Sequence, residues 1–332
     1  MSRIIGFGEV MMRLSPKPGT RLKNVDSLDV FYGGSEANAI GNCADAGDET
    51  VMITALPDNA LGDGAISALR SHGINTDHVV RDGERIGVYY MEQGNSIRPS
   101  TVVYDRKNSA IAVTDPSSYD FDQTTKGADW FHFSGITPAV SEKGKEAVEL
   151  ACQAAKRNGL KISCDVNYRS RMWTPEEAQK VMIPLMEYVD VCIVNEADAK
   201  NSLGIDTEGN DKNGAVRKIA ETFHCEAVAS AVMGEYSPVH NSFGGVLYYN
   251  GKIYETPSVY DLENMTDRTG AGDAMSGGLI HALCKWKDPQ KAIEYAMAAA
   301  ALKTSVRGDM NAFSEKEVLD FMKNSSSRGI QR

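Results

Sequence analysis

The sequence of 332 residues has no excess of positive charge, because its 45 acidic side chains outnumber its 35 lysines and arginines. The resulting formal net charge is −10. Proteins that hold nucleic acid on their surface depend on a basic face. We therefore expect no nucleic-acid partner, although this balance leaves room for local basic pockets that bind small anions.

Long hydrophobic runs are also missing. No segment has the ~20 consecutive apolar residues that a membrane span requires. The first ten residues, "MSRIIGFGEV", lack a charged region followed by a long apolar stretch. These absences predict a soluble, cytoplasmic protein with no membrane partner.

Neither cysteine nor histidine occurs in a metal-binding pattern. The six cysteines are widely spaced without a C-x-x-C pair, and the six histidines show no zinc-ligand spacing. Most of the cysteines lie in apolar runs such as "VDVCIVNE" and "GLKISCDV". We predict reduced thiols in the core of a cytosolic protein and no structural zinc.

Two common nucleotide-binding motifs are absent. The chain has no P-loop with its Gly-Lys-Ser/Thr ending. The early "GFGEV" is not a G-x-G-x-x-G turn opening a helix, and no acid follows at about 20 residues' distance. Both the P-loop and the dinucleotide-binding classes are thereby excluded.

What the sequence does contain is a regular alternation of apolar strand-like runs with amphipathic helical segments. Continuous apolar strands between helices are typical of a parallel sheet covered on both faces. The fold class predicted is a three-layer α/β/α sandwich with a mainly parallel sheet. In the C-terminal third the pattern predicts three helices, at Ala271–Trp286, Pro289–Thr304 and Ser314–Lys323.

Two stretches interrupt this alternation. Met11–Tyr32 is expected to be irregular, and Asp77–Ala112 is β-rich, rich in turns and without a helical period. We predict one catalytic domain over 1–332, with a small β lid formed by approximately 10–32 and 84–114. Exposed lid edges favour a homo-oligomer, either a dimer or a larger assembly.

The stretch "TDRTGAGDAMSGGLIHAL", Thr266 to Leu283, places an acid where a helix starts. Gly270 and Gly272 permit a tight turn, and the first turn of the helix has unpaired amides. This arrangement suits a phosphoryl group. The local pattern alone leaves open that Asp273 is an acid favoured in any first helical turn.

Three segments, taken together, resemble the PfkB family of ribokinase-like carbohydrate kinases. "DRTGAGDA" is similar to the family signature D-T-x-G-A-G-D, and "GGSEANAIGNCADAG" is similar to the other signature. Asn195 and Glu196, after an apolar strand, resemble the family's metal and nucleotide motif. The resemblance extends over nearly the whole chain. It implies a ribokinase-like fold and a kinase that uses ATP and Mg²⁺.

The family pattern implies roles for the residues of the glycine-rich turn. Asp273 would be the general base, and the amides of Gly270, Ala271 and Gly272 would form the anion hole. Asp267 matches a position that binds a monovalent cation, such as K⁺, in some members. A solvated loop acid is the alternative reading of Asp267.

Within the family, "GGSEAN", "VVYDRKNSAIA" and "CDVNYRSRMW" are similar to segments of 2-keto-3-deoxygluconate kinases. The resemblance implies ATP-dependent phosphorylation of the terminal hydroxyl of that sugar acid. It implies substrate contacts from Gly34, Ser35, Asn38, Tyr89, Tyr104, Arg106, Arg169 and Asp309. It places Asn167, Asn195 and Ser230 at the nucleotide, with Glu196 acting indirectly on Mg²⁺.

A cationic substrate pocket agrees with this interpretation, because an Arg fork pairs with a carboxylate in a planar, charge-assisted way. Neutral-sugar members usually carry an Asp after the first strand, where this chain has Arg13. The alternative is that Arg106 and Arg169 are surface residues, or pair with Asp105 or Asp165.

Other functions stay open at this stage. They are a fructokinase, another sugar or sugar-acid kinase of the family, and a non-catalytic regulator that binds a sugar acid. The polar segment "ASAVMGEYSPVHNSFGGVLY" replaces a K-x-G-x-x-G turn common in relatives. Nucleotide preference is therefore not determined by the sequence.

Overall fold

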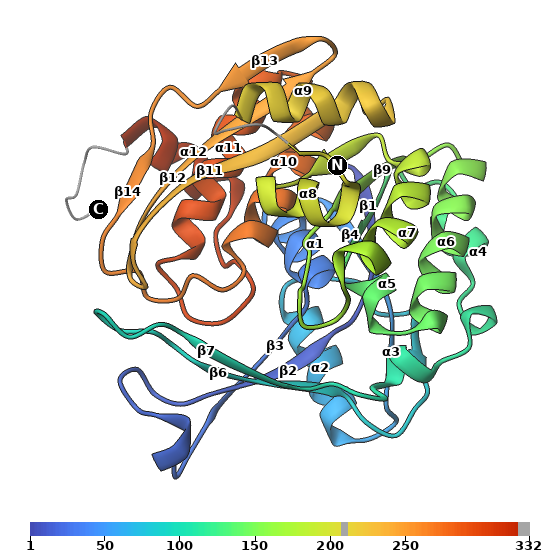
Figure 1. Cartoon of the computed structure of the whole chain (residues 1–332). Coiled ribbons are helices and arrows are strands. Elements are labelled where there is room, and N and C mark those ends of the chain that lie inside the picture. Colours follow the sequence, from blue (N-terminus) through green and yellow to red (C-terminus); the bar gives the residue numbers. More distant parts are fainter. Residues whose placement is uncertain (207–211, 325–332) are drawn as a thin grey trace.

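A computed structural model describes residues 1–206 and 212–324, and its centre is a large twisted sheet (Figure 1). The strand order is β13-β12-β11-β10-β9-β8-β1-β4-β5, and β14 pairs with β12. The ten strands are β1 (Arg3–Phe7), β4 (Glu49–Leu56), β5 (Val79–Arg81), β8 (Trp130–Ser134), β9 (Lys161–Asp165), β10 (Val191–Ile193), β11 (Ala227–Ser237), β12 (His240–Tyr249), β13 (Lys252–Glu255) and β14 (Tyr260–Leu262).

From β11 to β5 all neighbouring strands run parallel, whereas β12, β13 and β14 are antiparallel additions. The parallel strands are the apolar ones. Every residue of β8 and β10 is buried, as expected for strands covered on both faces. The predicted α/β class with a mainly parallel sheet is confirmed.

Helices cover both faces of this sheet and form two apolar cores. The longer helices are α1 (Ser35–Asp45), α2 (Ala60–Ser71), α6 (Glu142–Arg157), α7 (Pro175–Leu185), α8 (Glu196–Leu203), α9 (Lys212–Phe223), α10 (Ala271–Trp286), α11 (Pro289–Lys303) and α12 (Glu315–Asn324). Short helices are α3 (Ala110–Val113), α4 (Phe121–Thr125) and α5 (Thr137–Val140). None of the helices in the described chain has the length and apolar character to cross a membrane.

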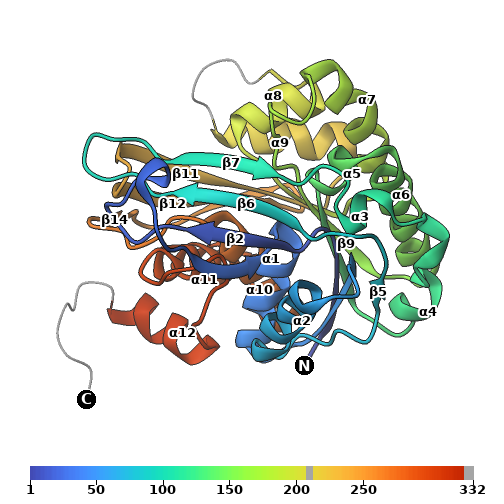
Figure 2. The ribbon, with the colours of Figure 1, turned by 90° about the horizontal axis from the view of Figure 1, so that it is seen from below.

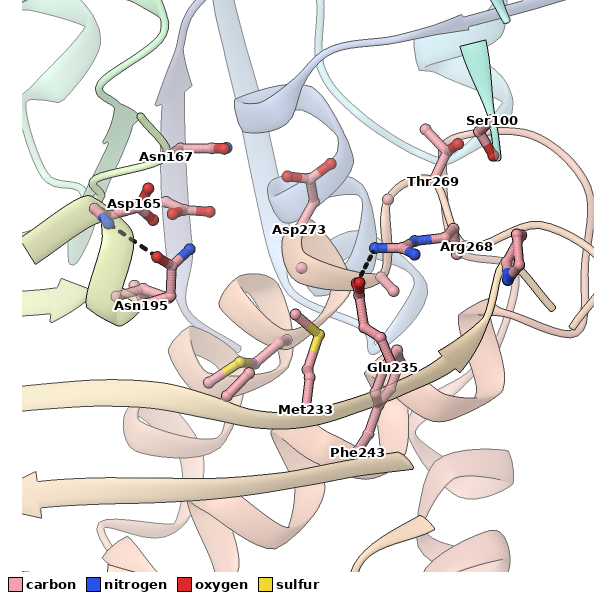
Figure 3. Close-up of a pocket in the computed structure, with 18 of the residues that line it drawn as sticks. Ser100, Asp165, Asn167, Asn195, Met233, Glu235, Phe243, Arg268, Thr269 and Asp273 are labelled. Carbon is pink, nitrogen blue, oxygen red and sulfur yellow. Dashed lines mark hydrogen bonds and ion pairs between the residues drawn. The ribbon is translucent and has the colours of Figure 1, made fainter. Parts of the chain in front are cut away.

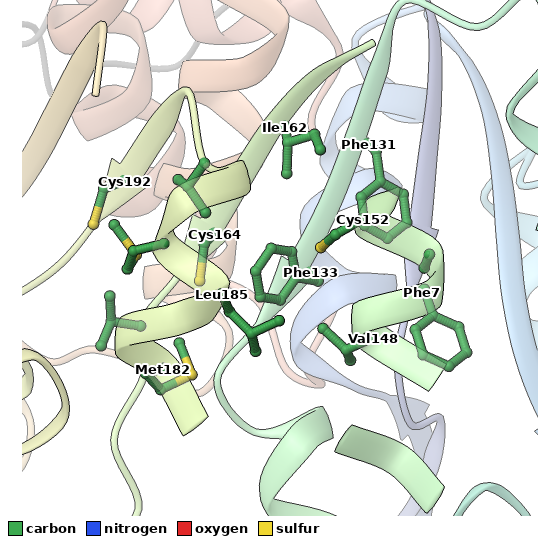
Figure 4. Packing of buried hydrophobic residues seen from close by; sticks show 14 of the residues in the cluster. Phe7, Phe131, Phe133, Val148, Cys152, Ile162, Cys164, Met182, Leu185 and Cys192 are labelled. Carbon is green, nitrogen blue, oxygen red and sulfur yellow. The ribbon is translucent and has the colours of Figure 1, made fainter. Parts of the chain in front are cut away.

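One core packs α6 and α7 against the central strands, as Figure 4 shows. Phe131 and Phe133 of β8 stack there with ring centroids 6.2 Å apart. The second core packs α1, α2, α10 and α11 on the opposite face. The six cysteines are free thiols, and all but Cys284 are buried, in agreement with the predicted core thiols.

A second sheet of four strands lies beside the carboxyl ends of the main sheet (Figure 2). Its order is β3-β2-β6-β7, formed by Asp29–Gly33, Met11–Ser15, Gly87–Glu92 and Thr101–Asp105. The expectation that Met11–Tyr32 is irregular holds for residues 16–28 but was wrong at both ends, where β2 and β3 pair and β2 also pairs in parallel with the distant β6. Such long-range pairing leaves no local pattern in "MMRLS". The function of this sheet as a lid, and the single domain over 1–332, stay predictions.

The C-terminal helices are confirmed, with the first beginning at Ala271 and ending at Trp286 as predicted. Strand β11 continues through the polar segment as far as Ser237, and the chain returns as β12 in a long antiparallel hairpin. The polar residues of this segment are therefore strand residues, and the segment is not a loop.

Helices α1 and α10 approach very closely at Gly277. A Cβ atom on Gly277 would lie 2.1 Å from the carbonyl oxygen of Ala39. The side-chain Nδ2 of Asn42 donates to the Ala274 carbonyl at 3.1 Å, which links the two helices close to this contact. This contact places the N-terminal turn of α1 beside that of α10.

We predict that Gly277→Ala lowers the free energy of unfolding by about 1–3 kcal/mol, because overpacking forces the two backbones apart. The matched control is Gly41→Ala on α1, where a Cβ would meet side-chain atoms of Ile74 and Met310 at an ordinary 3.7 Å. Thermal unfolding monitored by circular dichroism compares the two variants. A Gly277→Ala protein as stable as Gly41→Ala would contradict the proposed close contact.

Candidate active site

The site is built where the N-terminus of α10 meets the carboxyl ends of the central strands (Figure 3). Gly270 caps α10 with φ of 83°, a left-handed conformation that suits glycine. A side chain there would collide with the backbone, because a Cβ atom on Gly270 would lie 1.9 Å from the Asp309 carbonyl oxygen. The glycine is therefore required both by conformation and by space.

The turn presents free backbone amides. The N–H groups of Gly270, Gly272 and Asp273 have no hydrogen-bond partner among the described residues, whereas that of Ala271 donates to the Arg268 carbonyl at 3.2 Å. Free amides at a helix N-terminus, together with the helix dipole, favour an anion. Of the three predicted anion-hole residues, Ala271 is thus the one whose amide is already engaged.

The carboxylate of Asp273 is held by two residues of α1. Ser35 Oγ donates to Oδ1 at 3.0 Å, and Asn38 Nδ2 donates to Oδ2 at 2.7 Å. Asn167 in turn donates to Ser35 Oγ at 3.1 Å. Burial raises the pKa of Asp273 to about 6, against the opposing effect of these two hydrogen bonds. Its position and pKa suit a proton acceptor near neutral pH.

Two cavities meet at this carboxylate. The larger measures about 810 Å³ and the smaller about 180 Å³. The residues lining both are Met91, Asn167, Arg169, Thr269 and Asp273. One carboxylate can therefore face ligands in two adjoining spaces.

The smaller cavity gathers the predicted substrate residues, which come from the small sheet, from α1 and from connecting segments. All eight line it: Gly34, Ser35, Asn38, Tyr89, Tyr104, Arg106, Arg169 and Asp309. Tyr89 and Tyr104 lie side by side on β6 and β7, with ring centroids 5.9 Å apart. The structure thus brings this set together, while the role of each residue stays a prediction.

Arg13 does not line either cavity. It is fully buried, with Nη2 at 2.8 Å from Asp267 Oδ2 and Nη1 at 3.5 Å from Asp309 Oδ2. The Tyr89 hydroxyl donates to Asp309. Burial raises the pKa of Asp309, and the Arg13 charge opposes that rise. The Arg at this position neutralises buried acids and does not reach the cavity.

Arg106 pairs with a residue that sequence reasoning missed. Its guanidinium contacts the carboxylate of Glu9, whose other oxygen accepts from Ser109 Oγ at 2.5 Å. Asp105, the partner considered from the sequence, pairs with Arg85 instead at 2.8 Å. The "GFGEV" segment carries no local signal for this pair, because Glu9 and Arg106 meet only through the fold.

Arg169, in contrast, is exposed and forms no ion pair with a carboxylate of the described residues. Its guanidinium donates to the neighbouring Tyr168 carbonyl at 3.2 Å. Burial raises the pKa of Asp165 and of Asp273, and the Arg169 charge opposes both shifts from a distance. Arg169 is thus available to a ligand at the junction of the two cavities.

Asp267 is not a solvated loop acid, since only 2% of the residue is exposed. Its Oδ1 accepts from the Thr269 amide at 3.1 Å. Its Oδ2 accepts from the Gly308 amide at 3.1 Å and pairs with Arg13. Both carboxylate oxygens therefore have protein partners.

The larger cavity contains two of the predicted nucleotide residues, Asn167 and Asn195. Asn195 also caps α8 by accepting from the Asp198 amide at 2.9 Å. Ser230 and Glu196 do not line this cavity. Ser230 alternates along β11 with Ala231 and Met233, which line the cavity, so its side chain lies on the other face of the strand.

Two acids that were not singled out from the sequence line the larger cavity, Asp165 at the end of β9 and Asp198 in the first turn of α8. Burial raises the pKa of Asp165, and the charges of Asp273 and Asp198 raise it further. A signal existed in the sequence, because helical spacing turns the third residue after Asn195 back toward the helix start.

An ion pair crosses the rim of this cavity (Figure 3). Arg268 of the turn contacts Glu235 of β11 at 2.7 Å, and both side chains are partly exposed. Phe243 and Met233 of the hairpin form part of the wall beside it. The unusual polar segment therefore supplies the wall opposite the anion turn.

Comparisons with known proteins agree with this arrangement. The profile of the pfkB family carbohydrate kinases matches residues 1–316. A 2-dehydro-3-deoxygalactonokinase of Haloferax volcanii is 33% identical over 317 residues, which cover 96% of this chain and 95% of that protein.

Two solved structures share the fold. One is the crystal structure of 2-dehydro-3-deoxygluconokinase from Thermotoga maritima, with a TM-score of 0.95, 40% identity, and coverage of 97% of this chain and 98% of that one. The other is a putative ribokinase II from E. coli in complex with ATP and Mg²⁺, with a TM-score of 0.82, 22% identity, and coverage of 97% and 99%. The chain belongs to the pfkB family and is a carbohydrate kinase.

Proposed function

We propose that the protein phosphorylates the terminal hydroxyl of 2-keto-3-deoxygluconate, or of a stereoisomer of this sugar acid, with ATP as the phosphoryl donor. The observation that carries the proposal is the position of Asp273, whose half-buried carboxylate faces both cavities beside free amides. The smaller cavity would hold the sugar acid and the larger one the nucleotide.

In the proposed reaction the sugar hydroxyl oxygen attacks the γ-phosphorus of ATP while its proton passes to Asp273. The bond between the γ-phosphorus and the β–γ bridging oxygen breaks, and ADP leaves. The amides of Gly270 and Gly272 would donate to the oxygens of the transferred group as charge shifts onto them. Phosphoryl transfer depends mainly on positioning and charge neutralisation, so a well-placed carboxylate suffices as base.

The nucleotide side fits a metal-bound triphosphate. Asp165 and Asp198 line the larger cavity with Asn195, and carboxylate oxygens are the ligands that Mg²⁺ prefers. Mg²⁺ would neutralise phosphate charge when it is bound. We propose these two acids, in place of Glu196, as the residues that face the metal, directly or through water. The E. coli relative was solved with ATP and Mg²⁺.

An acidic substrate is supported by charges in the smaller cavity. Arg169 has no carboxylate partner among the described residues, and an uncompensated guanidinium there suits a carboxylate ligand. Arg106 would be shared between Glu9 and the substrate. The names of the Haloferax and Thermotoga relatives, which differ in the stereochemistry of the sugar acid, point to this substrate class.

A screen for ADP release tests the proposal directly. It would compare 2-keto-3-deoxygluconate, 2-keto-3-deoxygalactonate, ribose, fructose and adenosine at equal concentration. Faster turnover of a neutral sugar than of either keto-deoxy acid would refute the substrate class. Tight binding of a sugar acid without ADP release would instead favour a non-catalytic regulator.

Asp273→Asn should lower kcat by about 10²- to 10⁴-fold, because the amide cannot accept the proton. The KM for the sugar acid should change little, since Ser35 and Asn38 keep the side chain in place. Steady-state kinetics measure both quantities. Full activity in Asp273→Asn would refute the assigned base.

The pH profile should show an acid limb governed by Asp273. Because its pKa is raised to about 6, the carboxylate is ionised above that pH and kcat/KM should fall as pH drops below it. Ser35→Ala removes a donor that lowers this pKa, so its limb should move to higher pH. ATP titrates in the same way in the assays of the wild type and of Ser35→Ala. An acid limb at the same pH in both proteins would therefore contradict the assignment.

Arg169→Gln should raise the KM for the keto-deoxy acid about 10- to 100-fold, the effect of losing one charge-assisted contact. Turnover of the alcohol analogue that lacks the carboxylate should be unaffected. The matched control is Arg171→Gln, whose guanidinium donates to the Val102 carbonyl at 3.0 Å and lines neither cavity. Equal losses for the acid and its neutral analogue would rule out carboxylate recognition by Arg169.

A further inference from the structure

Lys303, the last residue of α11, is completely buried behind the anion turn. Its ammonium donates to the carbonyl oxygens of Asp267 at 3.3 Å and Val306 at 3.4 Å. It forms no direct ion pair with a carboxylate of the described residues. Burying an ammonium that is held mainly by backbone carbonyls costs desolvation free energy. The presence of one behind the anion turn therefore points to a role for its charge.

The side chain lies against the turn itself. A Cβ on Gly270 would meet Lys303 Cε at 3.3 Å, so the lysine stem passes directly beneath the cap of α10. The amides of Thr266 and Asp267 both donate to the Thr304 carbonyl, at 2.9 and 3.1 Å. The end of α11 thus holds the turn from behind, while the free amides face the cavity.

The surrounding charges balance. Burial lowers the pKa of Lys303, and the nearby carboxylates of Asp267 and Asp309 oppose that shift, whereas Arg13 adds to it. Two buried cations therefore accompany two buried acids. The carboxylate of Asp267 is already occupied by Arg13 and by two amides, which leaves its carbonyl oxygen to the ammonium.

Carbonyl oxygens next to buried carboxylates form an environment that a soluble monovalent cation would also fill. An ammonium attached to the chain differs in one respect. It occupies this place without a binding equilibrium, so its presence does not vary with the salt concentration.

We propose that Lys303 is the resident cation of the anion turn and a positioning residue for phosphoryl transfer, so that the kinase needs no soluble monovalent cation. The lysine fixes the Asp267 and Val306 carbonyls at one point and thereby aims the amides of Gly270 and Gly272. This inference rests on the proposed function and replaces the expectation of a K⁺ ion at Asp267.

The first experiment measures the wild-type protein in tetramethylammonium buffer at constant ionic strength, with and without KCl, NaCl or NH₄Cl. The rate with the keto-deoxy acid should change by less than about twofold, because general screening is held constant. Severalfold activation by K⁺ would overturn the inference. If no substrate of the screen gives ADP under any salt, the proposed kinase function fails instead.

Variants of Lys303 provide the sharper test. Lys303→Ala should lower kcat about 10- to 100-fold through a displaced turn, with little change in the KM of the sugar acid. K⁺ or NH₄⁺ should restore most of this loss, because each can enter the space left by the ammonium. Lys303→Met should lose as much without rescue, since methionine fills the volume without a charge.

The matched control is Lys291→Ala, on the same helix, whose ammonium lies over the Trp286 ring and contacts no residue of the site. It should keep wild-type activity and show no response to salt. Equal kcat in Lys303→Ala, Lys303→Met and wild type would overturn the proposal, as would identical rescue of the Ala and Met variants.

A readout independent of activity covers the case in which the variants turn over too slowly to measure. A cation that binds the folded state raises the unfolding temperature. K⁺ should therefore raise that temperature for Lys303→Ala and leave wild type and Lys303→Met unchanged. The same shift in all three proteins would show that the cation does not bind where the ammonium was, and would contradict the inference.

Discussion

The close approach of α1 and α10 is the constraint on which the rest of the site depends. Gly277 lies against the backbone of Ala39 without room for a side chain, and this contact sets the N-terminal turns of the two helices side by side. Only then can Ser35 and Asn38 of one helix hold the Asp273 carboxylate of the other. The geometry around the Asp273 carboxylate is thus a consequence of how near two backbones can come.

A second constraint joins the small sheet to the anion turn through buried charge. Arg13 comes from β2 and Tyr89 from β6, yet both contact Asp309, and Arg13 also contacts Asp267 directly before the turn. Buried ion pairs contribute little net stability, because desolvation offsets their attraction. Their effect here is geometric. A displacement of β2 or β6 would move Asp267 and Asp309, which lie next to the turn that carries the free amides.

Local sequence rules were enough for the features that are themselves local. The bounds of α10 follow from a glycine-rich turn and an apolar helix, and the parallel sheet follows from buried apolar runs. They failed where partners are distant in sequence. No local pattern near Glu9 predicts its pairing with Arg106. Arg13 was expected to indicate a cationic substrate pocket, but it is buried against two acids that lie roughly 250 to 300 positions later in the chain and therefore leave no local signal. Asp198 was missed although helical spacing was sufficient to find it.

The same charge balance bears on which sugars the smaller cavity can accept. Glu9 takes up Arg106, and Arg13 with Tyr89 takes up Asp309, so these groups largely neutralise one another. Arg169 is left with a charge that no carboxylate of the described residues meets directly. A neutral sugar would leave that guanidinium to water, whereas a sugar acid would compensate it. Selectivity for an acid would then come mainly from the uncommitted Arg169, because Arg106 would be shared between Glu9 and the substrate.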